Sequence, residues 1–157
     1  MDYTIRPMRA DEYPLLEDFL YEAIFIPDGV DPPPRDILLL PELQLYIKDF
    51  GTEKDDHCLV AETAGKVVGA VWVRIMNDYG HVDDKTPSFA ISLYKDYRGN
   101  GIGTALMTEM LALLKREGYR QASLAVQKAN YAVRMYKKTG FEIVGENDEE
   151  YIVICKL

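Results

Sequence analysis

The sequence has few of the residues that cross-link a small protein or bind a metal. It contains two cysteines and two histidines in 157 residues. Cys58 and Cys155 lie in apolar runs and neither belongs to a Cys-x-x-Cys pair, which is typical of buried free thiols in a reducing compartment. His57 and His81 are isolated, without a second ligand at helical or hairpin spacing. The sequence therefore predicts neither a disulfide nor a metal site.

Long apolar segments and an excess of basic residues are also missing. No stretch approaches the roughly 20 residues that span a bilayer, and no apolar core follows a basic N-terminus. We therefore expect a cytoplasmic protein with no signal peptide and no membrane partner. The 18 Lys and Arg are outnumbered by 26 Asp and Glu, for a formal net charge of −8. This balance argues against nucleic acid as a partner and suits a cationic amine, although it also serves solubility.

The length fits one domain covering residues 1–157, and the 48% hydrophobic content is enough for a core. The residue patterns predict strands at 3–9, 57–62, 67–76, 88–94, 121–126, 141–144 and 151–155. They predict helices at 11–24, with Asp11 as N-cap, and at 42–50, 102–117 and 130–139. Central hairpins and a later crossover helix indicate an α/β (α+β) fold with a mixed, mostly antiparallel sheet of six to seven strands and about four helices.

Three alternate glycines lie where a predicted strand meets a predicted helix, in Leu93-Tyr-Lys-Asp-Tyr-Arg98-Gly99-Asn100-Gly101-Ile102-Gly103-Thr104. Glycine allows a close backbone approach, and the first N–H groups of a helix have no internal partner. Together with the helix dipole and the charge of Arg98, these free N–H groups favour binding of a ligand that carries a diphosphate. Neither a Walker loop nor the Gly-x-Gly-x-x-Gly dinucleotide pattern fits, because the last glycine of the latter falls on Thr104. The alternative that this segment is a tight strand-to-helix turn that binds no ligand is left open.

Two blocks of the sequence resemble the GNAT acetyltransferase superfamily. The six residues from Arg98 to Gly103 resemble its Arg/Gln-x-x-Gly-x-Gly/Ala signature. The string Asn130-Tyr-Ala-Val-Arg-Met-Tyr136-Lys-Lys-Thr-Gly-Phe141 resembles a block that runs from an Asn through an Ala and a Tyr to Gly-Phe. The resemblance is strongest over residues 86–144. It implies the GNAT fold with splayed central parallel strands, and an N-acetyltransferase that uses acetyl-CoA as cosubstrate.

The resemblance also implies roles for individual residues. The CoA pyrophosphate would be held by the segment comprising Arg98, Gly99, Asn100, Gly101, Ile102, Gly103 and Thr104. The pantetheine arm would pair with main chain near Leu93, as a strand added at an open edge. Asn130 would contact the pantetheine or the chain nearby. Tyr136 would lie beside the sulfur and protonate the leaving thiolate as general acid. Simple packing of the Tyr136 ring under the CoA site is the alternative.

The acceptor implied by the resemblance is a primary amine of a small molecule or peptide, attacking directly in a ternary complex. Many relatives have Thr-Pro-Glu-Leu-Ala-Ile where this chain has Thr-Pro-Ser88-Phe-Ala-Ile, so a serine stands where they carry a carboxylate. Ser88 and Glu22 are expected to border the acceptor. The proton acceptor is left open among a water relayed by Ser88 and the carboxylates Glu22, Glu62, Asp83 and Asp84.

Two alternatives to the enzyme stay open, and the missing glutamate supports the first of them. The first is a non-catalytic acyl-CoA sensor, and the second is a structural or interaction module on the same scaffold. Dimerisation through the C-terminal strands also stays open.

Overall fold

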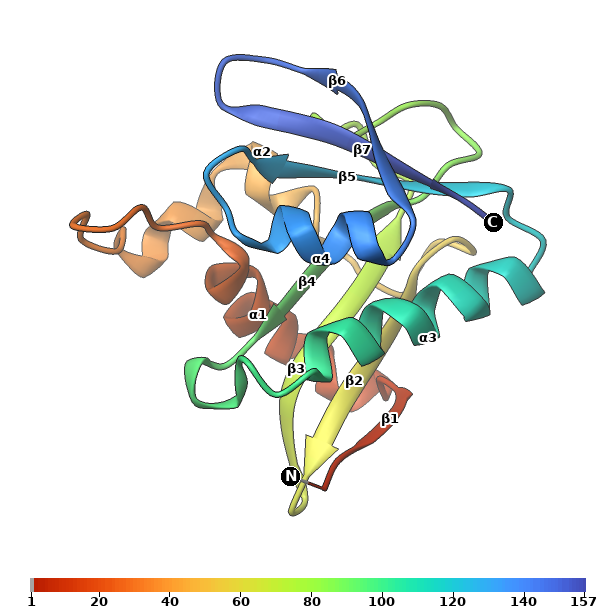
Figure 1. The fold of residues 1–157 in the computed structure, drawn as a ribbon. Helices are drawn as coiled ribbons and strands as arrows, with labels where there is room; N and C mark the ends of the chain where they lie inside the picture. Colours follow the sequence, from red (N-terminus) through yellow and green to blue (C-terminus); the bar gives the residue numbers. More distant parts are fainter. Residues whose placement is uncertain (1) are drawn as a thin grey trace.

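The computed structural model describes residues 2–157 and contains a seven-stranded sheet in the order β1-β2-β3-β4-β5-β7-β6 (Figure 1). The strands are β1 Thr4–Pro7, β2 His57–Thr63, β3 Lys66–Arg74, β4 Ser88–Leu93, β5 Gln121–Gln127, β6 Phe141–Glu146 and β7 Glu150–Lys156. All neighbours are antiparallel except β4 and β5, which are parallel. The predicted mixed sheet is confirmed.

Four α-helices cover the two faces of this sheet: α1 Leu16–Ala23, α2 Pro41–Gln44, α3 Ile102–Arg116 and α4 Ala132–Lys138. In Figure 1, α3 and α4 lie in front of the sheet and α1 lies behind it. The described residues also form three short 3-10 helices: η1 Ala10–Leu15, η2 Arg35–Leu39 and η3 Lys95–Tyr97. No helix within residues 2–157 combines the length and the apolar content needed to cross a bilayer.

The sheet separates two apolar cores because successive side chains of a strand point to opposite faces. On β3, Val71 and Val73 pack with α3, while Trp72 packs with α1 on the other face. Trp72 is fully buried, and its indole Nε1 donates to the Tyr46 carbonyl at 3.0 Å. The cores fix α3 and α1 on opposite faces of the strands that carry the candidate site.

The first predicted helix is α-helical only in its second half. Residues 10–15 form the 3-10 helix η1, which contains Pro14, a residue that has no N–H to donate. Arg9, and not Asp11, is the N-cap of this segment, and the Glu12 carboxylate accepts the Arg9 backbone N–H at 2.8 Å. The Asp11 N-cap prediction is therefore wrong.

The second predicted helix, at 42–50, is shortened to α2. Arg74 of β3 donates from Nη1 to the carbonyls of Leu45 and Lys48, at 3.2 and 2.8 Å. Those carbonyls would otherwise serve a continuing helix, and Asp49 adopts a left-handed φ of 53°. A buried cation from the sheet thus ends a helix that the local pattern would have extended.

Candidate active site

The parallel strands β4 and β5 touch at one end only. Their ladder consists of the single pair Ser88 and Ser123, whereas β5 pairs with β7 at seven positions. Beyond that pair the facing edges of β4 and β5 are not joined, and edges of this kind can accept an added strand. The predicted splay of the central strands is confirmed.

The loop between β4 and α3 presents open main chain at the end of this gap. Gly99 and Gly101 adopt left-handed φ values of 78° and 82°. Ideal Cβ atoms built on them would meet no heavy atom within 4 Å, so open space lies over both glycines. These φ values favour glycine. Asn100 between them is exposed, with its amide Nδ2 donating to the Arg98 carbonyl at 3.4 Å.

The first turn of α3 continues this surface with unpaired amides. The first helical bond runs from the Ala105 N–H to the Gly101 carbonyl at 3.1 Å, so the N–H groups of residues 102–104 have no partner inside the helix. Thr104 is exposed, whereas Ile102 is fully buried and can offer only its main chain. Together the loop and helix form a concentration of backbone donors that suits a phosphate group.

Gly103 serves packing more than ligand approach. A Cβ at this position would lie 3.6 Å from the Leu93 side chain and 3.8 Å from the Met135 sulfur, both ordinary contacts. An alanine would fit here. Leu93, at the end of β4, is 8% exposed and fills the space beside α3.

Arg98 is half-buried, with 35% of its side chain exposed, and it bonds to two neighbouring segments. Its Nε donates to the Leu93 carbonyl at 3.0 Å, and its Nη2 lies 3.1 Å from the Glu22 carboxylate. The ion pair offsets the Arg98 charge and ties the loop to β4 and to α1. The structure therefore brings Arg98 and Glu22 together, and their assignments to phosphate and acceptor stay predictions.

Tyr136 on α4 is 6% exposed, and its ring packs edge-on against Phe141 with 6.0 Å between centroids. Burial raises the pKa of the Tyr136 phenol to about 12, so the hydroxyl stays protonated at neutral pH. Asn130 precedes this helix, and its Oδ1 accepts the Ala132 N–H at 2.9 Å. The side-chain oxygen of Asn130 thus helps to start the helix that carries Tyr136.

The other face of the gap holds a carboxylate that the sequence analysis missed. Ser88 is fully buried, and its Oγ donates to Asp78 Oδ1 at 3.0 Å. Asp78 lies in the β3–β4 connection, ten residues before Ser88, and of the carboxylates in this connection the sequence analysis named only Asp83 and Asp84. A search for carboxylates within reach of the start of β4 could have found it.

The carboxylates that the sequence analysis did consider lie elsewhere. Glu62 on β2 lies 3.6 Å from Arg6 near the sheet edge. Asp83 accepts the Lys85 N–H and the Thr86 hydroxyl, each at 2.8 Å, and the Asp84 side chain is 95% exposed. None of the three contacts Ser88 among the hydrogen bonds and ion pairs described.

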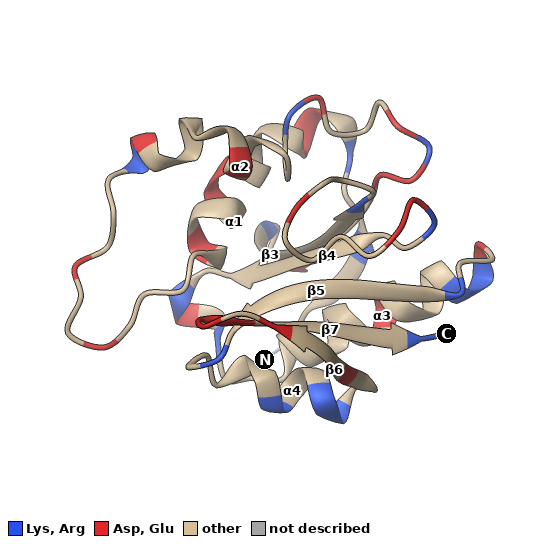
Figure 2. Ribbon diagram, turned by 90° about the horizontal axis from the view of Figure 1, so that it is seen from above, with Lys and Arg blue, Asp and Glu red and all other residues tan. Residues whose placement is uncertain are grey.

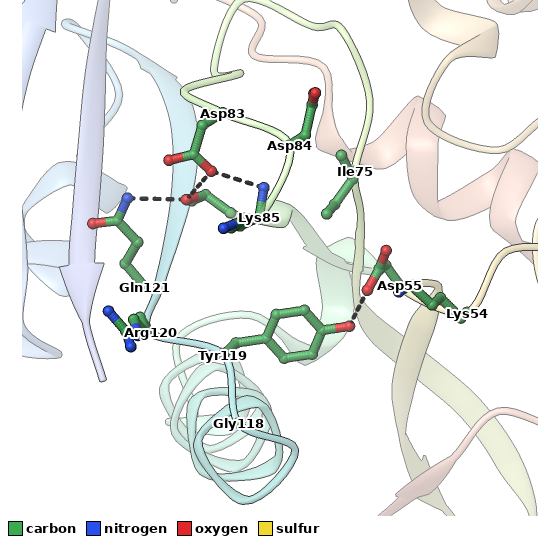
Figure 3. Close-up of a pocket in the computed structure, with 11 residues that line it drawn as sticks. Lys54, Asp55, Ile75, Asp83, Asp84, Lys85, Gly118, Tyr119, Arg120 and Gln121 are labelled. Carbon is green, nitrogen blue, oxygen red and sulfur yellow. Dashed lines mark hydrogen bonds between the residues drawn. The ribbon is translucent and has the colours of Figure 1, made fainter.

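A separate cleft of about 550 Å³ lies at the opposite end of α3 (Figure 3). Some of its polar groups bond one another: Tyr119 donates to Asp55, and Gln121 donates to the Thr86 hydroxyl at 2.9 Å. Within residues 2–157, no three His, Cys, Asp or Glu side chains gather as metal ligands do.

Comparison with known proteins is consistent with this geometry. A family model described as "Acetyltransferase (GNAT) family" matches residues 19–141. Acetyltransferase SG1711 of Sodalis glossinidius is 38% identical over 90 residues, which cover 56% of this chain and 58% of that protein. N-acetyltransferase 8B of Homo sapiens is 27% identical over 113 residues, covering 71% and 50%. The chain thus spans about half the length of these relatives.

Solved structures share the fold over the whole chain. A GNAT-family acetyltransferase from Streptococcus pneumoniae superposes with a TM-score of 0.72 at 20% identity, covering 99% of this chain and 100% of that one. The PaiA N-acetyltransferase from Thermoplasma acidophilum, solved in complex with coenzyme A, gives 0.70 at 18% identity and covers 100% of both chains.

Proposed function

Since the chain belongs to the GNAT family of acetyltransferases, we propose that it transfers the acetyl group of acetyl-CoA to a primary amine of a small molecule or peptide. The observation that carries the proposal is the loop of residues 98–104 at the open end of β4 and β5. It offers space over Gly99 and Gly101, and unpaired amides at the start of α3.

These residues fit coenzyme A as a cosubstrate. The main chain of residues 99–104 would bind the pyrophosphate, because backbone N–H groups at a helix N-terminus attract anions. The unpaired edges of β4 and β5 beyond Ser88 would receive the pantetheine arm as an added strand. Arg98 would stiffen the loop, because it already bonds to Leu93 and Glu22.

Tyr136 suits protonation of the leaving thiolate. A thiol pKa is near 8.5, well below the value of about 12 to which burial raises the pKa of Tyr136. The phenol therefore holds its proton at neutral pH and donates a hydrogen bond as negative charge develops on the sulfur. The acetyl group is activated by its thioester to CoA, and the chain supplies position, donors and a proton acceptor.

The names of structural neighbours guide the choice of acceptors to test. One is a spermidine N-acetyltransferase chimera, and another is the ribosomal-protein-S18-alanine N-acetyltransferase of Escherichia coli. We would therefore assay thiol release from acetyl-CoA with spermidine, with a peptide bearing an N-terminal alanine, and with a panel of simple primary amines. CoA binding is measured in parallel by calorimetry.

The proposal expects both CoA binding and thiol release that depends on an amine. Binding without turnover on every amine would favour the acyl-CoA sensor, for which the serine at position 88 is the supporting observation. Absence of CoA binding would remove both and leave a structural module.

A further inference from the structure

We propose that Asp78, acting from the β3–β4 connection, is the proton acceptor for the incoming amine, standing in for the carboxylate that Ser88 replaces. The inference deepens the proposed amine acetylation and rests on it. It assigns the base to a different element of the fold, because the carboxylate comes from a loop that crosses the end of the sheet gap and not from β4.

The position of Asp78 is set by contacts to both splayed strands. Its Oδ1 accepts the Ser88 hydroxyl at 3.0 Å, and its Oδ2 accepts the Tyr46 hydroxyl at 3.0 Å. Two residues later, the Gly80 carbonyl accepts the Ser123 hydroxyl at 2.7 Å. The connection therefore bridges β4 and β5 at the closed end of their gap.

Gly80 lets the connection lie directly on β5. A Cβ at this position would lie 3.0 Å from the Ala125 backbone nitrogen, which is tighter than nine in ten real Cβ contacts. The loop is thus pressed against the main chain of β5, one step beyond the last β4–β5 pair. Its closeness to both strands holds the Asp78 carboxylate in one place.

Asp78 lies on the face of the sheet that faces away from α3. Phe89 points into the core under α3, so Ser88, its neighbour on β4, points to the face that carries α1. Tyr136 belongs to the core on the α3 side. Asp78 and Tyr136 therefore approach the gap from opposite faces, which suits a base that receives a proton from the amine and an acid that gives one to the sulfur.

No cation neutralises Asp78 in the part of the chain that the structure describes. The groups that face it are the hydroxyls of Tyr46 and Ser88, the backbone N–H of Gly80, and the Glu150 carboxylate of β7. On its own loop, the His81 N–H donates to the Asp78 carbonyl at 3.1 Å. Burial raises the pKa of Asp78, which brings it closer to that of a working base.

The charges around the gap favour a cation at this place. Figure 2 shows the acidic turn between β6 and β7 beside the end of the gap between β4 and β5. Glu150 pairs in register with Gln127 at the end of β5, and burial also raises the pKa of its carboxylate. Lys128 pairs with Glu146 of the acidic turn, which leaves the Asp78 and Glu150 carboxylates to meet an ammonium group that enters here.

The proton and bond changes balance as follows. Asp78 removes one proton from the ammonium group, and the neutral nitrogen forms a bond to the thioester carbonyl carbon. The carbon–sulfur bond breaks, and Tyr136 donates a proton to the departing thiolate. The second nitrogen proton, lost as the amide forms, restores the Tyr136 hydroxyl. The proton on Asp78 is released to solvent, so that one ammonium ion and one thioester give one amide, one thiol and one proton.

The test is the acetyl-transfer assay on Asp78→Asn and Asp78→Glu, using the most active amine of the panel. We expect Asp78→Asn to lower kcat by about 100- to 10,000-fold, the usual worth of a general base, with CoA affinity unchanged. Asp78→Glu should recover part of the rate. The acid limb of the kcat/KM profile, where activity rises as Asp78 deprotonates, should vanish in Asp78→Asn.

Matched controls separate chemistry from folding. Tyr46→Phe and Ser88→Ala each remove one hydrogen bond to Asp78 but keep the carboxylate, so both should retain the acid limb. Asp83→Asn changes a carboxylate of the same connection that faces the distant cleft, and it should retain the wild-type rate. Circular dichroism and calorimetric CoA binding verify that each variant folds.

Each outcome decides the inference. A folded Asp78→Asn that keeps the wild-type rate and acid limb overturns the role of Asp78 while leaving amine acetylation intact. A loss in Tyr46→Phe as large as that in Asp78→Asn would mean that the contact network, and not the carboxylate, matters. If the wild-type chain binds CoA and acetylates no amine, the proposed function fails, and the base assignment fails with it.

Discussion

The two ends of α3 differ in the surface that they present to a ligand. At its N-terminus the loop of residues 98–104 presents unpaired amides with open space over two glycines. At its C-terminus lies a cleft of about 550 Å³. There the helix end is closed by bonds from the N–H groups of Glu117, Gly118 and Tyr119, and Tyr119 and Gln121 of the cleft donate to Asp55 and Thr86. Free backbone donors therefore distinguish the N-terminal end of α3, and cavity volume distinguishes the C-terminal end.

Two tyrosines, Tyr119 and Tyr136, show a second difference, which lies in the partners of their hydroxyl groups. Tyr119 donates to the Asp55 carboxylate, and burial together with Asp55 raises its pKa. For Tyr136, burial is the first cause of the raised pKa, followed by the charge of Tyr131. A phenol that already serves a carboxylate is poorly placed to protonate a ligand, whereas Tyr136 has no carboxylate among these causes.

The largest expected effect is on CoA binding in Gly101→Asp. The new carboxylate would face the diphosphate, and at about 4 Å near a protein surface this repulsion is worth about 4 kcal/mol. We expect calorimetric Kd for CoA to rise by at least about 100-fold. Gly118→Asp is the matched control at the other end of α3, with a similar φ of 92° and equally open space, and it should bind CoA normally. Equal loss in both would point to backbone strain as the cause.

The next effect is on turnover in Tyr136→Phe. Removal of the hydroxyl should lower kcat by about 100-fold while CoA affinity is retained, because the lost interaction forms only as the thiolate departs. Tyr119→Phe, measured in the same thiol-release assay, should keep the wild-type kcat. Unchanged turnover in Tyr136→Phe would exclude the hydroxyl from the reaction and leave only ring packing.

Tyr136 should also make the fold sensitive to alkali. An unfolded tyrosine ionises near pH 10, whereas burial raises the folded pKa to about 12. Between these values the unfolded state loses a proton that the folded state keeps, so stability falls as pH rises. Relative to Tyr136→Phe, urea unfolding should show the wild type losing about 1.4 kcal/mol per pH unit above pH 10. Parallel curves for the two proteins would contradict this origin of the shift.

The smallest effect is expected in the cleft, from Thr86→Val. The Thr86 hydroxyl donates to Asp83 at 2.8 Å and accepts from Gln121 at 2.9 Å. Its loss should cost about 1 kcal/mol in urea unfolding, since both partners can turn to water. Thiol release should not change. A fall in kcat with full stability would instead make the cleft part of the active site.

Prediction succeeded where neighbours in sequence decide the structure. The strand, turn and helix around residues 88–117, and the glycines with positive φ, depend on residues within a few positions of one another. The helix that carries Tyr136 is local in the same way, because the Asn130 side chain accepts the Ala132 N–H where the helix begins. Helix limits were less predictable, because Pro14 turned residues 10–15 into a 3-10 helix and Arg74 drew away the carbonyls beyond α2.

The sequence by itself determined the individual strands, the glycine loop and the family, because their patterns are local and their residues are close along the chain. Only the tertiary structure decided that Arg98 forms an ion pair with Glu22. It also decided that Asp78 lies beside Ser88, while Asp83 and Asp84 do not. These outcomes depend on how α1 packs beside the C-terminal end of β4 and how the β3–β4 connection packs beside its start. Side-chain pairing there is fixed by the packing of segments that no short-range pattern brings together.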